Sequence, residues 1–128
     1  MFKNFVKEKI TDSLPVYGTW NTLGSPMVTE VMAHAGFDFI IIDFEHGSFS
    51  ISEVHNYVNA CERYSCSPIV RVPGKFDWMI QQVLDQGAHG VILPGIETSQ
   101  DVRDFVEAVK FKPQGHRGFT PHTKAGGF

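Results

Sequence analysis

Apolar and polar positions alternate along this chain in a way that predicts strands and helices in turn. Short runs of β-branched and aromatic residues predict four strands, at residues 16–20, 37–44, 68–73 and 90–94. After each run, apolar residues recur at the three- and four-residue spacing of a helix. This alternation indicates an α/β fold built on a parallel sheet.

The expected helices have recognisable starts and apolar stripes. Three residue pairs predict an N-cap or a capping box: Ser25 with Pro26, Ser50 with Glu53, and Thr98 with Asp101. The side chains expected to face the core are Met27, Val28, Val31, Met32 and Ala35, then Val54, Tyr57, Val58 and Cys61, then Phe76, Met79, Ile80, Val83 and Leu84, and finally Val102, Phe105, Val106 and Val109.

The number of strand–helix units points to half of a larger architecture. Four units fall short of the eight that close a (β/α)8 TIM barrel, so we expect a half-barrel with the first four units. A compact doubly wound sheet is the alternative, although no Gly-rich phosphate-binding motif follows any strand. Residues 1–128 are expected to form one domain, with 114–128 as a terminal loop that either covers a site or is disordered.

The amino-acid composition limits which binding partners and which cellular compartment we expect for this protein. The 11 Lys and Arg against 14 Asp and Glu give a net charge of −3, which predicts no nucleic-acid or anionic-membrane partner. The longest apolar run, 37–44, is interrupted by Asp38 and Asp43 and predicts no membrane span. The N-terminus lacks the pattern of a secretory signal, and the spacing of Cys61 and Cys66 predicts reduced, structural thiols. We therefore expect a cytoplasmic protein.

Candidate chemistry lies where the predicted strands end. Asp43, Glu45 and His46 follow the second strand and Arg71 ends the third, at the edge where α/β folds place their sites. Carboxylates two residues apart point the same way and can orient a neighbouring imidazole as a general base; alternatively, Asp43 and Glu45 satisfy backbone amides. The Arg71 guanidinium suits a carboxylate ligand; alternatively, it pairs with Asp43 or Glu45.

Short motifs in a fixed order carry a resemblance over nearly the whole chain. They are Gly18-Thr19-Trp20, Ser25-Pro26, Ala35-Gly36-Phe37-Asp38, Asp43-Phe44-Glu45-His46-Gly47, Val70-Arg71-Val72-Pro73, Leu84-Asp85-Gln86-Gly87-Ala88-His89-Gly90-Val91 and Pro113-Gln114-Gly115-His116-Arg117-Gly118. The sequence resembles the HpcH/HpaI aldolase family. The resemblance implies a (β/α)8 barrel that cleaves a 4-hydroxy-2-oxo acid into pyruvate and an aldehyde. It also implies a divalent metal (Mg²⁺, Mn²⁺ or Co²⁺) and a hexamer with active sites near subunit interfaces.

The same resemblance assigns roles by position. It implies that His46 is the acid/base group, that Arg71 holds the pyruvate carboxylate and its enolate, that Asp85 supports the histidine and that Trp20 lines the pocket. However, Asp85 falls in the last turn of the third predicted helix, away from the expected site. A negative charge there is unfavourable and indicates a compensating partner. Asp85 is therefore expected either to reach a neighbouring subunit's site or to be a solvated acid.

The family's metal-binding Glu and Asp belong to strands that would follow Arg117-Gly118, so no metal ligand is expected within these 128 residues. We expect a metal-dependent (class II) aldolase, a carbon–carbon lyase, whose isolated half is inactive. A complementing C-terminal half or a homo-oligomer would complete it. The alternative is a noncatalytic half-barrel that associates with other proteins through its open sheet edges.

Overall fold

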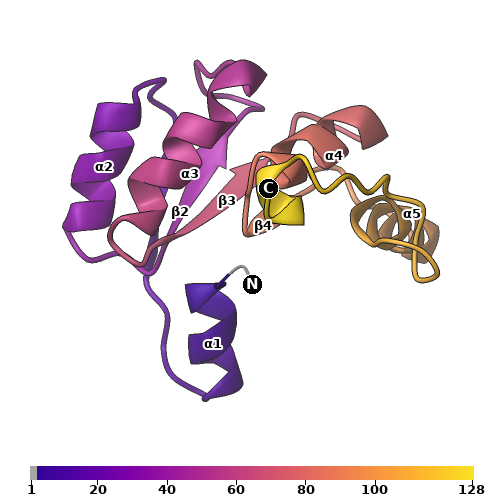
Figure 1. Ribbon diagram of the computed structural model, residues 1–128, viewed down its shortest axis with the longest axis horizontal. Helices are drawn as coiled ribbons and strands as arrows, with labels where there is room; N and C mark the ends of the chain where they lie inside the picture. The colour runs from indigo at the N-terminus through magenta and orange to yellow at the C-terminus, as the bar shows by residue number, and fades with distance from the viewer. Residues whose placement is uncertain (1–2) are drawn as a thin grey trace.

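Four short parallel strands form one sheet in which the spatial order follows the chain order (Figure 1). The computed structural model describes residues 3–128. The strands are β1 (Gly18–Asn21), β2 (Phe39–Asp43), β3 (Ser67–Arg71) and β4 (Gly90–Ile92). A doubly wound sheet reverses its strand order at a switch point. The order β1-β2-β3-β4 has no reversal, so that alternative is wrong and the barrel-type half sheet is confirmed.

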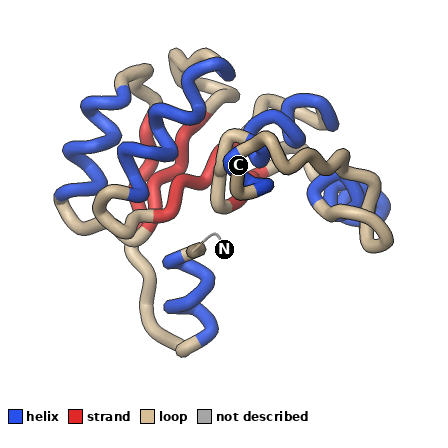
Figure 2. Tube along the Cα trace, viewed as in Figure 1, coloured by secondary structure: helices blue, strands red, loops and turns tan. Residues whose placement is uncertain are grey.

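Helices follow each strand, as expected; the first three of these lie over one side of the sheet, and the last lies beyond it beside the third (Figure 2). They are α2 (Pro26–His34), α3 (Val54–Glu62), α4 (Asp77–Asp85) and α5 (Ser99–Val109), with 3-10 turns η1 (Ile51–Glu53) and η2 (Lys124–Gly126). A further helix, α1 (Phe5–Thr11), precedes β1 and was not predicted. Within residues 3–128, no helix combines the length and the apolar character needed to cross a bilayer.

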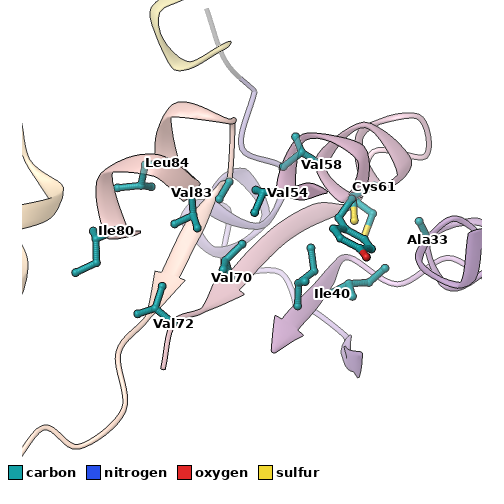
Figure 3. Close-up of a cluster of buried hydrophobic side chains, with 14 of the residues drawn as sticks. Ala33, Ile40, Val54, Val58, Cys61, Val70, Val72, Ile80, Val83 and Leu84 are labelled. Carbon is teal, nitrogen blue, oxygen red and sulfur yellow. The ribbon is translucent and has the colours of Figure 1, made fainter. Parts of the chain in front are cut away.

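The core lies between the strands and the helices that cover them (Figure 3). Ile40 and Val70 point from the sheet toward Val54 and Val58 of α3, and all four are fully buried. Successive strand residues point to opposite faces of the sheet, so every second side chain belongs to this core and the ones between them face the open side.

The two cysteines are structural residues, as predicted, and both belong to this core. Cys61 and Cys66 are both free and buried. The hydrogen bond with Cys66, together with burial, raises the pKa of the Cys61 thiol well above its ordinary value. A buried thiol with a raised pKa is a packing residue rather than a nucleophile.

Two predicted helix faces are wrong in part. In α2, Met27 and Val31 are 75% and 65% exposed, and Ala35 is exposed too, whereas Thr29 and Ala33 face the core. The predicted stripe marks apolar positions correctly but gives the wrong rotation, because within residues 3–128 α2 packs on β2 and α3 and has no element on its outer flank.

The same error recurs in the second half of the chain. Val102 and Val106 of α5 are exposed, although Ala108 is buried. Phe76, expected in the core, precedes α4 and is also exposed. The helix that flanks the other sheet edge thus also turns apolar side chains outward.

The cap predictions have mixed outcomes. Ser25 and Thr98 cap α2 and α5, and Thr98 forms the expected capping box. The box predicted at Ser50 is wrong, because its hydroxyl bonds the Ser52 hydroxyl and a 3-10 turn precedes α3.

The segment 114–128, which we call the strap, is held against the helices rather than disordered. The Arg117 amide donates to the Lys110 carbonyl at 3.0 Å. Further on, Lys124 Nζ contacts Glu62 Oε2 at 2.6 Å and Asn59 Oδ1 at 2.7 Å on α3. The strap therefore crosses the outside of the helical layer and ends beside α3.

Candidate active site

The register of the strands brings three predicted residues to one end of the sheet. Asp43 pairs with Arg71 across β2 and β3, and Trp20 pairs with Ile41 across β1 and β2. Residues in register point to the same face of a parallel sheet. Trp20, Asp43 and Arg71 therefore meet on the open face, at the carboxyl ends of the strands.

Asp43 is the centre of this group. Its carboxylate is nearly fully buried and accepts the Trp20 indole N–H at 2.8 Å. It also accepts the amides of Glu45 at 3.0 Å and His46 at 3.2 Å. Burial alone would raise the pKa of Asp43, but these hydrogen bonds and the Arg71 charge together lower it. Asp43 is thus an ionised anchor, and the alternative that the carboxylates satisfy backbone amides is met by Asp43, whereas Glu45 contacts Arg71 instead.

Arg71 is held from three sides. Its Nη1 lies 3.3 Å from Asp43 Oδ2, its Nη2 contacts Glu45 Oε2, and its Cζ lies 5.5 Å from the Trp20 ring centroid. The ion-pair alternative for Arg71 is therefore what the structure contains. A guanidinium has five N–H donors, so these contacts leave donors for a ligand.

His46 stands at the rim of the group. Its side chain is 67% exposed, and its Nε2 lies 3.7 Å from Glu45 Oε2. Its backbone is fixed by the amide bond to Asp43, so the ring projects from a held position. An accessible imidazole is chemically able to accept or donate a proton.

Asp85 does not join this group within the chain. It ends α4, and its Oδ1 accepts from Arg117 Nη2 at 2.5 Å. The Arg117 side chain is 7% exposed, and its Cζ lies 4.6 Å from the Phe111 ring centroid. The place of Asp85 at the end of a helix predicts a compensating partner, and Arg117 of the strap is that partner.

A buried polar group at the opposite end of the sheet was missed from the sequence. His89 Nδ1 lies 3.1 Å from Ser67 Oγ, and its Nε2 lies 3.2 Å from Glu62 Oε1. The Val6 amide donates to the same Ser67 hydroxyl at 3.1 Å, which ties α1 to the sheet. No local pattern marks such a group, because its members come from three separate elements.

The residues at the site do not fit a divalent metal. Within residues 3–128, no cluster of three His, Cys, Asp or Glu side chains has the arrangement of a metal centre. Asp43 already accepts from an indole, two amides and Arg71, and Glu45 faces the same guanidinium. Carboxylates engaged in this way have no free pair of oxygens for an ion.

Comparison with known proteins gives a consistent set of matches. The family model for HpcH/HpaI aldolase/citrate lyase matches residues 17–125. A hydroxypyruvate/pyruvate aldolase of Paraburkholderia phytofirmans is 36% identical over 90% of this chain and 43% of its own length. A 5-keto-4-deoxy-D-glucarate aldolase of Salmonella paratyphi A is 30% identical over all of this chain and 50% of its own length.

Solved structures agree with these matches. An HpcH/HpaI aldolase/citrate lyase family protein from Burkholderia cenocepacia superposes with a TM-score of 0.89 at 34% identity, over 98% of this chain and 52% of that one. Citrate synthase SbnG gives a TM-score of 0.87 at 33% identity, over 94% of this chain and 49% of that one. The chain spans about half the length of the curated relatives it matches.

Proposed function

Because this chain belongs to the HpcH/HpaI aldolase/citrate lyase family, we propose that it carries the 2-oxo-acid-binding half of a (β/α)8 aldolase. The whole enzyme would reversibly cleave a 4-hydroxy-2-oxo acid into pyruvate and an aldehyde. The observation that carries the proposal is the meeting of Trp20, Asp43 and Arg71 on the open face, at the carboxyl ends of the strands.

Arg71 is the proposed binding group for the substrate carboxylate. Asp43 and Trp20 hold its guanidinium in place, and a rigid, always-charged fork matches the two oxygens of a carboxylate. A carboxylate arriving on Nη2 would take the place of the Glu45 carboxylate, which also lies 3.7 Å from His46 Nε2. Trp20 would then form one wall of the pocket.

His46 is the proposed acid/base group. In cleavage it would take the proton of the C4 hydroxyl as the C3–C4 bond breaks, which releases the aldehyde and leaves the enolate of pyruvate. A proton returned to C3 would complete pyruvate. The exposed ring beside Glu45 supports this role, because an accessible imidazole can exchange protons with a bound substrate and a neighbouring carboxylate can orient it.

The remaining parts of the enzyme are proposed to come from outside these residues. The family resemblance implies a divalent metal that would supply electrophilic activation of the keto group, with ligands on the other half of the barrel. For Asp85, the ion pair with Arg117 supports a structural role in this chain, and a role in a neighbouring subunit's site would require that pair to open.

Association is proposed as the way the open face becomes covered. A complementing C-terminal half or further copies of the chain would pair with the free edges of β1 and β4. The same free edges support the second candidate function, a noncatalytic half-barrel that acts through protein–protein association in the cytoplasm.

A complementation assay tests the proposal. The chain is co-expressed with the C-terminal half of the Paraburkholderia phytofirmans aldolase, and pyruvate release from a 4-hydroxy-2-oxo acid is followed with Mg²⁺, Mn²⁺ or Co²⁺. We expect release only when both halves are present, and its loss with Arg71→Ala. An assembled complex with undiminished activity after Arg71→Ala would contradict the proposed site, and an assembled but inactive complex would favour the noncatalytic alternative.

A further inference from the structure

The loop that carries His46 rests against a neighbouring turn. We propose that the turn at residues 22–24, which follows β1, positions His46, with Gly24 as the positioning residue. The inference rests on the proposed role of His46, but the contacts that carry it are independent of that role.

A glycine is required at position 24 for steric reasons. A Cβ on Gly24 would lie 1.8 Å from the carbonyl oxygen of Ser48 and 2.9 Å from its carbonyl carbon. Both atoms belong to the backbone, so no side-chain rotation relieves the overlap. Any larger residue at position 24 must displace the loop that contains Ser48, two residues beyond His46.

The His46 loop is fixed on its other side by β2. The His46 amide donates to Asp43 Oδ1, and the Gly47 amide donates to the Asp43 carbonyl at 2.9 Å. The Ser48 amide then donates to the Thr22 carbonyl at 3.2 Å. His46 is therefore held between the end of β2 and the 22–24 turn, and a shift of the turn moves the loop against Asp43.

The turn is itself held by hydrogen bonds from buried side chains. Asn21 Oδ1 accepts the Leu23 amide at 2.8 Å, and Asn21 Nδ2 donates to Thr29 Oγ1 at 2.9 Å. The Thr29 hydroxyl in turn contacts the Ser25 carbonyl at 3.3 Å. Asn21 and Thr29 are both fully buried, so the first turn of α2 anchors the 22–24 turn.

Two N–H groups report on the loop and on the strands separately. In amide NMR spectra, the His46 backbone signal reports the loop, and the Trp20 indole signal reports the bond between β1 and Asp43. For Gly24→Ala we expect a displaced His46 signal and an unchanged Trp20 indole signal. Gly90→Ala is the matched control, because its added methyl meets Ile69 at an ordinary 3.7 Å and should leave His46 unmoved.

A second variant covers the case in which Gly24→Ala prevents folding. Thr29→Val keeps the shape of the side chain but removes the hydroxyl that anchors Asn21, and we expect a smaller displacement of the same His46 signal. An unmoved His46 signal in a folded Gly24→Ala protein, or in Thr29→Val if Gly24→Ala does not fold, would overturn the inference.

The kinetic consequence is measured in the complemented enzyme. A misplaced acid/base group lowers turnover by about 10²-fold, whereas carboxylate binding at Arg71 is untouched. We therefore expect Gly24→Ala to lower kcat and leave KM within about 2-fold. A rise in KM as large as the fall in kcat would overturn the positioning role. If the NMR displacement occurs in a complex whose parent is inactive, the support of the loop stands and the proposed function fails.

Discussion

The two faces of the sheet differ in the side chains they present, although the same strands form both. On the helix-covered face, Ile42 and Val70 are fully buried and contribute only packing. On the open face, Trp20 is 47% exposed, and Asp43 and Arg71 form charged contacts beside it. Because neighbouring residues of a strand point to opposite faces, stability and chemistry should be separable by changing alternate residues.

The largest effect is expected at the rim of the open face. In the complemented enzyme, His46→Ala should lower kcat by about 10²–10⁴-fold because a general acid–base group is lost. Its free energy of unfolding should stay the same, since the ring is largely exposed. His55→Ala, on an exposed face of α3, is the control and should leave kcat unchanged. An unchanged kcat for His46→Ala would remove this residue from the mechanism.

On the covered face, the expected effect is on stability. Ile42→Ala should lower the free energy of unfolding by about 2–5 kcal/mol, because it leaves a cavity in the core. Ile69→Ala, on the open face and only half-buried, should cost less. Urea denaturation of both variants measures the difference. Equal losses would mean that the open face is packed as tightly as the covered one.

A conservative change at Arg71 tests the geometry of the open face. Arg71→Lys keeps the charge but loses the fork that contacts Asp43 and Glu45, so kcat/KM of the complemented enzyme should fall by roughly 10–100-fold. Steady-state kinetics on a 4-hydroxy-2-oxo acid provide the measurement. Equal kcat/KM in both proteins would point to a purely structural Arg71.

Self-association of the chain is expected because its open face leaves apolar side chains uncovered. Uncovered apolar side chains each forgo about 1.5–3 kcal/mol of burial, so the chain should elute as a dimer or a larger species. Ile92→Asp, on the free β4 edge, should shift light scattering toward monomer or unfolded chain. Asn56→Asp, which adds the same charge to α3, should not. A well-folded monomer of the parent chain would show that the open face needs no cover.

The smallest effect is a pH dependence of the free energy of unfolding, which arises at the amino-terminal ends of the strands. Asp38 contacts Lys9 of α1 and accepts the Tyr17 amide at 2.9 Å. The pKa of Asp38 lies below its ordinary value of 3.8. The main cause is the hydrogen bond from Lys9, and the second is the hydrogen bond from the Tyr17 amide. The stabilisation is therefore present above that value and is lost as the pH falls through the folded pKa.

Asp38→Asn should remove this acid-side loss, about 1 kcal/mol or less for a pair near the surface. Chemical denaturation at pH 6 and at a series of lower pH values measures it. If the free energy of unfolding falls equally steeply with pH in the parent and the variant, other carboxylates cause the acid sensitivity.

Much of the fold could be predicted because its signals are local. The continuous apolar run of β2 and the caps at Ser25 and Thr98 depend on residues close in sequence, and each is where the pattern places it. Arg71 and Asp43 could also be placed, since strand ends of one sheet share an edge.

The rest depends on contacts that no local pattern contains. The rotation of α2, which leaves Met27 and Val31 outside, is set by neighbours that a periodicity does not identify. The sequence of the strap has no helix or strand signal, so it predicts a loop that either covers a site or is disordered. Its order comes from distant ion pairs, Arg117 with Asp85 and Lys124 with Glu62.

The bond between Trp20 and Asp43 also makes the site optically visible. Trp20 and Trp78 are the two tryptophans of the chain, and Trp78 lies outside the site on α4 with 57% of its surface exposed. In a Trp78→Phe protein, all indole fluorescence therefore originates from the ring that touches Asp43 and Arg71. The proposed binding of pyruvate can then be tested by emission intensity alone, with no dye, tag or coupled reaction.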